Sequence, residues 1–145
     1  MTYLPTKPVR TSQVRRGDLS LRINEWGNWG APKLFLCHGW MDTGLSWQFV
    51  ADALSNDWHV IAPDWRGFGG SGRPEGGYWF ADYYADFEAI LNHFSPDQAA
   101  SVVGHSMGGK IISQYAGLRP DRIAQLINIE GFGMPSLEPK QIISR

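Results

Sequence analysis

The sequence predicts an α/β fold, in which helices cover both faces of a mainly parallel sheet. Short apolar runs bounded by turn residues alternate along the chain with segments whose apolar residues recur every three or four positions. Continuous apolar runs are typical of strands buried on both faces. With 145 residues and 43% hydrophobic content, the chain is long enough for a core of its own. We therefore expect one domain spanning residues 1–145.

The amino-terminal third contains three predicted elements. Residues 11–26 read as a β-hairpin, because two short runs of strand-forming residues flank a Gly-Asp turn. Leu34–Cys37 is a continuous apolar run and predicts a buried strand. Ser46 is expected to cap a helix whose apolar positions continue at helical spacing to Leu54.

The middle of the chain predicts a strand, a long loop and a helix. His59–Ala62 is the strand, and the glycine-rich stretch 64–78 is the loop. Beyond it, residues 80–94 carry aromatic and aliphatic side chains every three or four positions, which is the strongest helical stripe in the sequence.

The last predicted elements are a strand at Ser101–Val103, a helix over 111–118 that is closed by Gly117 and Pro120, and a strand at Leu126–Ile129. Parallel strands that alternate with helices point their carboxyl ends to one edge of the sheet. We expect the active residues at that edge.

The segment 104–109, which reads G-H-S-M-G-G, carries the chemistry. It matches the G-x-S-x-G nucleophile elbow and lies between a predicted strand and a predicted helix. Such a turn exposes the serine oxygen at the helix N-terminus, where the helix dipole favours a developing anion. Ser106 is therefore the predicted nucleophile for attack on an acyl carbon.

An acyl-transfer site also needs two N–H donors for the oxyanion. The residue after the nucleophile, Met107, is the expected first donor. The loop after an earlier strand supplies the second, and Trp40 follows the strand Leu34–Cys37. The backbone N–H groups of Trp40 and Met107 are the predicted oxyanion hole.

Together these motifs resemble the first half of an α/β-hydrolase. His38-Gly39-Trp40, the loop 64–71 (D-W-R-G-F-G-G-S) and the elbow 104–109 occur in the family's order and spacing, and the resemblance covers residues 11–134. It implies a sheet truncated after about strand six, so that the domain is incomplete at its C-terminus. Strands seven and eight, the usual acid, the catalytic histidine and most of any cap would lie beyond Arg145.

Two nucleotide-binding motifs compete with this interpretation. Residues 104–110 satisfy G-x-x-x-x-G-K, but Ile111 stands where a P-loop needs Ser or Thr for magnesium. Residues 67–72 satisfy G-x-G-x-x-G, but a dinucleotide fingerprint opens directly into a helix and this one does not. We expect no cofactor, no metal and a structural role for the loop.

None of the four histidines stands where the family places its base, and none follows Ser106. Glu130, after the last strand, is the candidate acid, because some families of this fold place it there. The chain by itself is therefore expected to be inactive or nearly so. A non-catalytic ligand-binding or interaction protein of the same fold is the alternative, and self-association through the exposed edge at 126–129 is expected.

Composition restricts the partners. The net charge is −1 with both signs interspersed, which argues against nucleic acid and anionic membranes. Cys37 is the single cysteine, and no apolar run is long enough to cross a bilayer. We expect a cytoplasmic protein that acts on a small ester-like substrate. A serine rather than an aspartate at the elbow narrows the reaction to esters, thioesters, lactones, amides or certain C–C bonds.

Overall fold

The structure is a computed structural model that describes residues 3–131. Its strands are β1 (Arg10–Arg16), β2 (Leu19–Gly27), β3 (Lys33–Cys37), β4 (His59–Pro63), β5 (Ala100–His105) and β6 (Ile123–Ile129). Its helices are α1 (Gln48–Ala53), α2 (Phe80–Phe94) and α3 (Met107–Leu118), with short 3-10 turns η1 (Gly44–Trp47) and η2 (Pro120–Arg122). The predicted alternation of strands and helices is confirmed.

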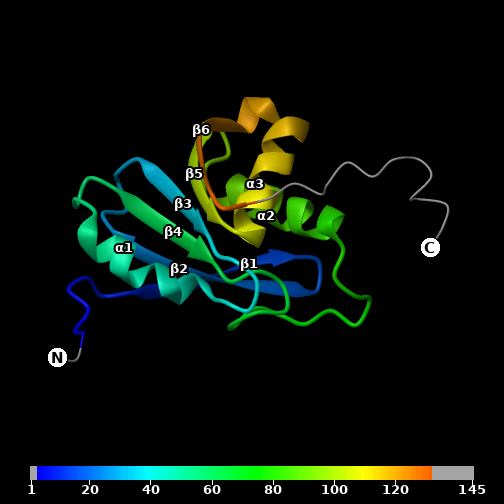
Figure 1. Cartoon of the computed structure of the whole chain (residues 1–145), viewed down its shortest axis with the longest axis horizontal. Coiled ribbons are helices and arrows are strands. Elements are labelled where there is room, and N and C mark those ends of the chain that lie inside the picture. Colours follow the sequence, from blue (N-terminus) through cyan, green and yellow to red (C-terminus); the bar gives the residue numbers. More distant parts are fainter. Residues whose placement is uncertain (1–2, 132–145) are drawn as a thin grey trace.

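The strands form one sheet in the order β1-β2-β4-β3-β5-β6. The predicted hairpin is β1–β2, and β2 also pairs antiparallel with β4. The pairs β3–β4, β3–β5 and β5–β6 are parallel, as expected for a mainly parallel sheet. Figure 1 shows the parallel strands with their carboxyl ends turned toward the loop that precedes α2 and toward the start of α3.

One face of the sheet is covered by α2 and α3. The predicted stripe of α2 lies inward, and Phe87 meets Phe35 of β3 edge-to-face with ring centroids 6.3 Å apart. Phe87 also contacts the ring of Tyr115 on α3, 5.0 Å away. These side chains join Trp65 and others in the larger of the two buried clusters.

The other face is covered by α1 only in part. Trp26, Leu36 and Val60 lie under this short helix and are almost fully buried. Over β5 and β6, no described helix covers this side. A groove of about 290 Å³ runs there between α1 and β6. Cover on both faces is thus confirmed for the middle of the sheet but not for its β6 side.

Two local expectations need correction. Ser46 is not a helix cap: it lies inside η1, and its hydroxyl donates to Asp42 instead, so α1 begins two residues later at Gln48 without a side-chain cap. The helix α3 passes through Gly117 rather than closing there, and it ends at Leu118, two residues before Pro120, as the other part of the expectation has it.

Candidate active site

Ser106 is the single residue between the end of β5 and the start of α3. Its backbone has φ 51° and ψ −115°, a conformation that non-glycine residues rarely adopt. Within residues 3–131 the other non-glycine residues with positive φ are Met41 and Glu130. They follow β3 and β6, so all three lie at the carboxyl edge of the sheet. Strain gathered at one edge is typical of a functional site.

The glycines around Ser106 allow the tight strand-to-helix turn. A Cβ on Gly104 would come 2.6 Å from the Gly109 nitrogen, and one on Gly108 would lie 2.6 Å from the His38 carbonyl oxygen. A Cβ on Gly109 would meet the side chain of Asn128. These neighbours are backbone atoms or a hydrogen-bonded side chain, so they cannot easily move aside. The helix α3 can therefore start this close to β5 and β3 only because these three positions are glycines.

The loop after β3 lies directly against the elbow. A Cβ on Gly39 would be 3.0 Å from Nδ1 of His105 and 3.2 Å from Cβ of Ser106. The next residue, Trp40, brings its N–H to the same edge. Neither this N–H nor that of Met107 has a hydrogen-bond partner among the described residues. Both N–H groups thus lack a partner within residues 3–131, and their role as an oxyanion hole stays a prediction.

His38 holds this loop in place and cannot serve as the base. Its Nε2 accepts a hydrogen bond from the Trp65 N–H (2.9 Å), so its proton sits on Nδ1 and is donated to the Gly39 carbonyl (2.7 Å). The Trp65 indole donates back to the His38 carbonyl (3.1 Å). Burial lowers the pKa of His38, against smaller opposing contributions from Gly39 and nearby carboxylates. The ring is neutral, and both of its nitrogens take part in hydrogen bonds.

Asp64 organises the loop that follows β4. Its buried carboxylate accepts hydrogen bonds from the backbone N–H groups of Gly44 (2.7 Å) and Gly70 (2.8 Å) and from the Asn24 amide (3.1 Å). Its own carbonyl accepts from the Ser71 hydroxyl (2.6 Å). Asp64 therefore braces three segments, which agrees with a structural role.

Arg66 connects the same loop to α2. Its guanidinium is 4% exposed and donates to both carboxylate oxygens of Asp86, at 2.6 and 2.7 Å. Asp82 contributes a second carboxylate at 3.2 Å. The hydrogen bond to Asp86 raises the pKa of Arg66 further, although burial opposes it. Arg66 belongs to the loop motif 64–71 found in the sequence, but its partner Asp86 was not predicted. The only sign of Asp86 in the sequence is a carboxylate directly before Phe87, within the apolar stripe of α2.

The remaining histidines do not reach the Ser106 hydroxyl, which has no hydrogen-bond partner among residues 3–131. His105 is exposed at the end of β5, and His93 lies in the last turn of α2. His59 begins β4 at the opposite end of the sheet, where its Nε2 lies 2.9 Å from Glu25. All four histidines of the sequence are thereby placed, and none is bonded to the predicted nucleophile.

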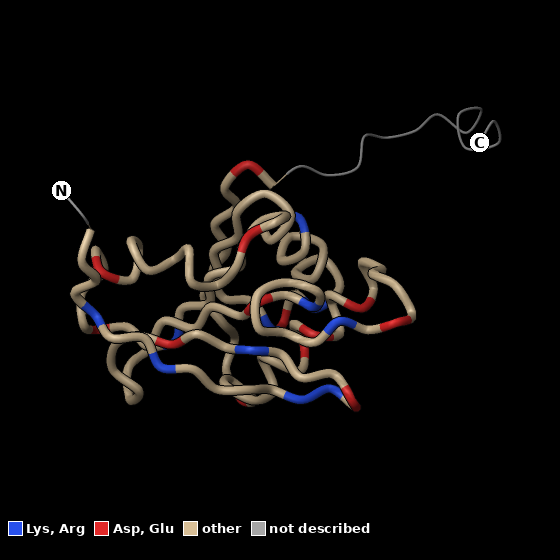
Figure 2. The backbone as a smooth tube through the Cα atoms, turned by 90° about the horizontal axis from the view of Figure 1, so that it is seen from below, with Lys and Arg blue, Asp and Glu red and all other residues tan. Residues whose placement is uncertain are grey.

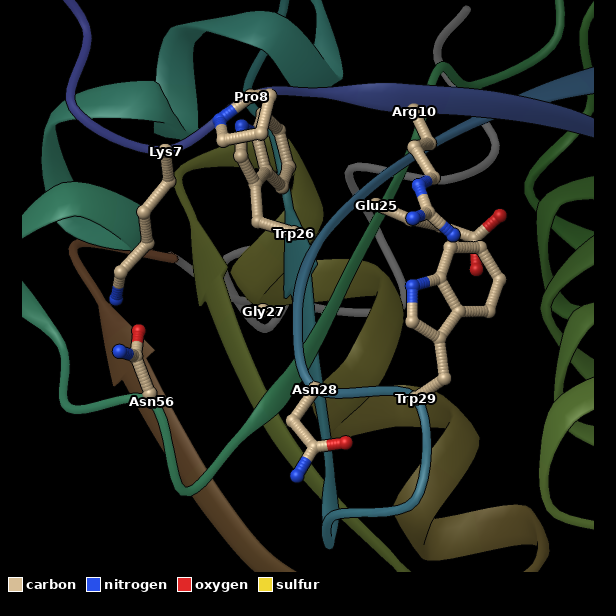
Figure 3. A pocket seen from close by; sticks show the side chains of 9 residues that line it. All are labelled: Lys7, Pro8, Arg10, Glu25, Trp26, Gly27, Asn28, Trp29 and Asn56. Atoms are coloured by element: carbon tan, nitrogen blue, oxygen red, sulfur yellow. The ribbon is translucent and has the colours of Figure 1, made fainter.

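Glu25 also lines a cavity of about 390 Å³ at this opposite end (Figure 3). There the Arg10 guanidinium lies over the Trp29 ring, 5.0 Å from its centroid. The Trp29 ring in turn lies 4.8 Å from that of His59. This cavity shares no lining residue with the elbow or with the loop after β3.

Glu130 follows β6 beside the elbow. The Ser106 N–H donates to the carbonyl of Ile129, the preceding residue (2.9 Å), so Glu130 and Ser106 leave the sheet at adjacent positions. Asn128 stabilises this turn by accepting from the Gly131 N–H (2.7 Å) and donating to its carbonyl (3.0 Å). The Glu130 carboxylate is exposed and forms no hydrogen bond with the described residues. The candidate acid therefore lies at the expected edge.

The geometry excludes both nucleotide-binding alternatives. A P-loop needs several residues between strand and helix to wrap a phosphate, whereas Ser106 alone connects β5 to α3. The Lys110 ammonium lies 4.0 Å from the centroid of the Phe80 ring. The glycine-rich stretch 67–72 is followed by more loop, since α2 begins only at Phe80.

Charge is spread over the described chain rather than gathered. Figure 2 shows basic and acidic positions interspersed along the backbone. None of the helices within residues 3–131 is long and apolar enough to cross a membrane. In the same part of the chain, no three His, Cys, Asp or Glu side chains gather in a way that would hold a metal ion.

Known proteins share this architecture. The chain is 34% identical to epoxide hydrolase A of Mycobacterium tuberculosis over 89% of its length and 40% of that protein. It is 33% identical to a serine hydrolase-like protein of Danio rerio over 78% of its length and 35% of that protein. Among solved structures, the thioesterase domain from the curacin biosynthetic pathway superposes with a TM-score of 0.83 at 29% identity, covering 94% of this chain and 49% of that domain.

The chain thus spans less than half the length of these relatives. The model of the alpha/beta hydrolase fold family matches residues 32–144, which include the loop after β3, the elbow and Glu130. Because that match extends over most of the sequence and the sheet has the same architecture as solved members, this chain belongs to the α/β-hydrolase family.

Proposed function

We propose that this chain carries the nucleophile and oxyanion hole of a serine hydrolase that cleaves a carboxylic ester or a related acyl bond. The Ser106 oxygen attacks the acyl carbon, its proton passes to a base, and the bond to the leaving group breaks. Water then hydrolyses the acyl-Ser106 intermediate. The observation that carries the proposal is the strained Ser106 backbone, beside the free N–H groups of Trp40 and Met107.

The chemistry of serine favours acyl transfer over epoxide opening, although some relatives are epoxide hydrolases. Attack of a serine oxygen on an epoxide carbon forms an ether, which has no carbonyl carbon for water to attack. Attack on an ester or thioester forms an acyl-enzyme, which water can cleave. The similarity to a thioesterase domain supports the same choice.

The substrate is proposed to be small and apolar around its acyl group. Exposed aromatic side chains stand at the carboxyl edge of the sheet: Trp40 is 63% exposed and Trp79 is 70% exposed. The Trp40 ring meets the Phe68 ring edge-to-face, with centroids 5.4 Å apart. Aromatic walls around a few polar groups are typical of ligand sites.

Glu130 is proposed as the acid that would orient and stabilise a protonated base. Its support is its position beside Ser106 and its strained backbone. The base itself is not one of the four histidines described above. We therefore propose that these 145 residues alone turn substrate over slowly or not at all, and that the complete reaction uses a base supplied from elsewhere.

The absence of a histidine partner for Ser106 favours a second candidate function, a ligand-binding protein of the same fold without turnover. The two candidates differ in one property. A catalytic elbow forms a covalent adduct at Ser106 when a base is present, whereas a binding protein does not.

Cytoplasmic location also remains a proposal, based on the single buried thiol of Cys37.

Chemical rescue tests the catalytic proposal. The chain is incubated with a fluorophosphonate, with and without added imidazole, and the adduct is located by peptide mass spectrometry. Because the Ser106 oxygen lacks a base, imidazole should accelerate the formation of an adduct at Ser106 by about tenfold or more. The adduct should be lost in Ser106→Ala.

Ser101→Ala is the matched control, since this serine lies on β5 away from the elbow. It should leave the adduct and its acceleration unchanged. An adduct at other serines only, or no adduct at any imidazole concentration, would contradict the catalytic proposal. A folded chain that binds an ester analogue without forming an adduct would favour the second candidate.

A further inference from the structure

The loop between β3 and η1 crosses the carboxyl edge of the sheet beside Ser106. Gly39 lies against the elbow, and Trp40 carries the N–H group that is proposed above as an oxyanion donor. Within residues 3–131, the N–H groups of Trp40 and Met41 donate no hydrogen bond. These groups do not hold the middle of the loop in place, so its position depends on its two ends.

Met41 gives the loop a strained shape. Its φ is 55°, in the left-handed region that non-glycine residues rarely adopt. Its side chain is 81% exposed, so packing against the described residues does not account for this conformation. Such strain persists only where the surrounding structure fixes the backbone. The two ends of the loop must therefore be firmly held.

Two adjacent residues after β4 hold these ends. At the start of the loop, the Trp65 N–H donates to Nε2 of His38 (2.9 Å), and the Trp65 indole donates to the His38 carbonyl (3.1 Å). At the far end, the Gly44 N–H donates to Oδ1 of Asp64 (2.7 Å). Gly44 also lies so close to β4 that a Cβ there would come 2.5 Å from the Ala62 carbonyl oxygen. Both ends of the loop are thus fixed by one segment.

Asp64 can hold Gly44 because Asp64 is itself tied to the sheet and to its own loop. It is 1% exposed, and its N–H donates to the Arg22 carbonyl on β2 (2.8 Å). Its carboxylate also accepts from the Asn24 amide (3.1 Å) and from the Gly70 N–H (2.8 Å). Hydrogen bonds to an ionised acceptor are roughly twice as strong as neutral ones. Gly44 is therefore joined to β2 through a strong, buried connection.

We propose that Asp64 is a positioning residue for the oxyanion hole: through Gly44 it fixes the far end of the loop and keeps the Trp40 N–H beside Ser106. This inference rests on the proposed acyl-Ser106 chemistry. Donors that are held in place before the reaction stabilise an oxyanion without a reorganisation cost. Without the bond from Gly44, Met41 would relax toward negative φ, and the Trp40 N–H would no longer be held in place.

Fluorophosphonate labelling of Ser106 in the presence of imidazole tests the inference, because the phosphonyl oxygen occupies the position of an oxyanion. Asp64→Ala removes the acceptor for Gly44 and should lower the maximal labelling rate by about tenfold or more. The fluorophosphonate concentration that gives half of this rate should stay the same. Asp64→Asn should recover most of the rate, because its amide oxygen can still accept from the Gly44 N–H.

Asp86→Ala is the matched control. It also removes a buried carboxylate that braces the segment after β4, but it does so through Arg66 and not through the oxyanion loop. Urea denaturation gives the folded fraction of each variant, and labelling rates are compared per folded molecule. Asp86→Ala should lower the stability without lowering the labelling rate.

Equal labelling rates of folded Asp64→Ala and Asp86→Ala would overturn the inference and leave the proposed function intact. An Asp64→Asn variant as slow as Asp64→Ala would also overturn it. A wild-type chain without an adduct at Ser106 would overturn the proposed function and the inference with it. If Asp64→Ala does not fold, hydrogen exchange of the wild-type chain decides. The Gly44 amide should then exchange about tenfold or more slowly than the Met41 amide, and equal protection of the two would overturn the inference.

Discussion

At the scale of single residues, the elbow depends on the glycines around Ser106, which have no side chain, as much as on Ser106 itself. Ser106 stays in its strained conformation because Gly104, Gly108 and Gly109 allow backbone to approach backbone on both sides. The same helix contains Gly117, around which nothing lies within 4 Å. Replacement by alanine is therefore expected to destabilise the fold at a tightly packed glycine of the elbow and to stabilise it at Gly117.

Gly108→Ala should destabilise the fold by about 3 kcal/mol, because its Cβ would collide with the Cys37 and His38 carbonyls at the end of β3. Gly117→Ala should stabilise it by about 0.5–1 kcal/mol, since alanine loses less backbone entropy in a helix. Urea denaturation gives the free energy of unfolding of each variant. Equal effects of the two substitutions would show that α3 does not abut β3 as described.

The sequence motif found these elbow residues but not the partners that hold them. A local pattern identifies Ser106, Gly104 and Gly108 because all lie within six residues of one another. The hydrogen bond at Nε2 of His38 comes from Trp65, 27 positions away, which also donates to the His38 carbonyl. Such partners become visible only once β3 and β4 are known to be neighbours.

At the scale of elements, ion pairs and side-chain hydrogen bonds connect segments that are distant in sequence. The loop after β4 is joined to α2 by Arg66 and Asp86, and the N-terminal segment is joined to α1 by Asp52. The two connections differ in burial. Their responses to mutation and to pH should therefore differ as well.

Asp86→Ala should destabilise the fold by about 3–5 kcal/mol, because it leaves the guanidinium of Arg66 buried without its bidentate partner. The double replacement Arg66→Met with Asp86→Leu should recover most of that loss, since it removes both buried charges. The exposed pair Arg119–Asp121 is the control, and Asp121→Ala should leave the free energy of unfolding almost unchanged. Thermal or urea unfolding measures all three. An Asp86→Ala loss no larger than the control would contradict the burial of the pair.

Asp52 should titrate below the ordinary range of aspartate. Burial by itself raises its pKa, but hydrogen bonds from the Tyr3 hydroxyl and from the N–H groups of Thr6 and Lys7 outweigh it and lower the pKa. The same contact raises the pKa of Tyr3 to about 12. The contribution of this contact to stability is therefore complete above the unfolded pKa of about 3.9 and is lost as pH falls through the lower folded value.

Carbon-13 NMR of the Asp52 carboxyl measures this titration directly. Tyr3→Phe removes one donor and should move the pKa of Asp52 upward. Tyr78→Phe, which leaves the donors to Asp52 in place, should not change it. An Asp52 pKa that is the same in all three proteins would show that the Tyr3 hydroxyl does not donate to this carboxylate.

At the scale of the whole molecule, the two faces of the sheet are unequally covered. Phe35 lies between β3 and α2 with no exposed surface, whereas Val103 faces the groove on the α1 side and is only partly buried. Within residues 3–131, the α2 side of the sheet is therefore covered by helices, whereas the α1 side is covered only in part.

Phe35→Ala should cost about 3–5 kcal/mol, since it removes a large side chain from an enclosed core. Val103→Ala should cost less than about 1 kcal/mol, because its methyl groups already border a groove. The free energies of unfolding from urea denaturation should separate the two variants clearly. A Val103→Ala loss comparable to that of Phe35→Ala would show that the groove is filled in solution.

The sequence by itself determined the α/β class, the hairpin, the long helix and the elbow, because each depends on a period or a motif within a short window. It also placed Ser106, Trp40, Met107 and Glu130 at strand ends, which in a parallel sheet share one edge. Only the tertiary structure decided that β2 lies between β1 and β4, that His38 is fully engaged and that Asp86 pairs with Arg66. Strand order and burial arise from packing between segments far apart in the chain, which no local pattern encodes.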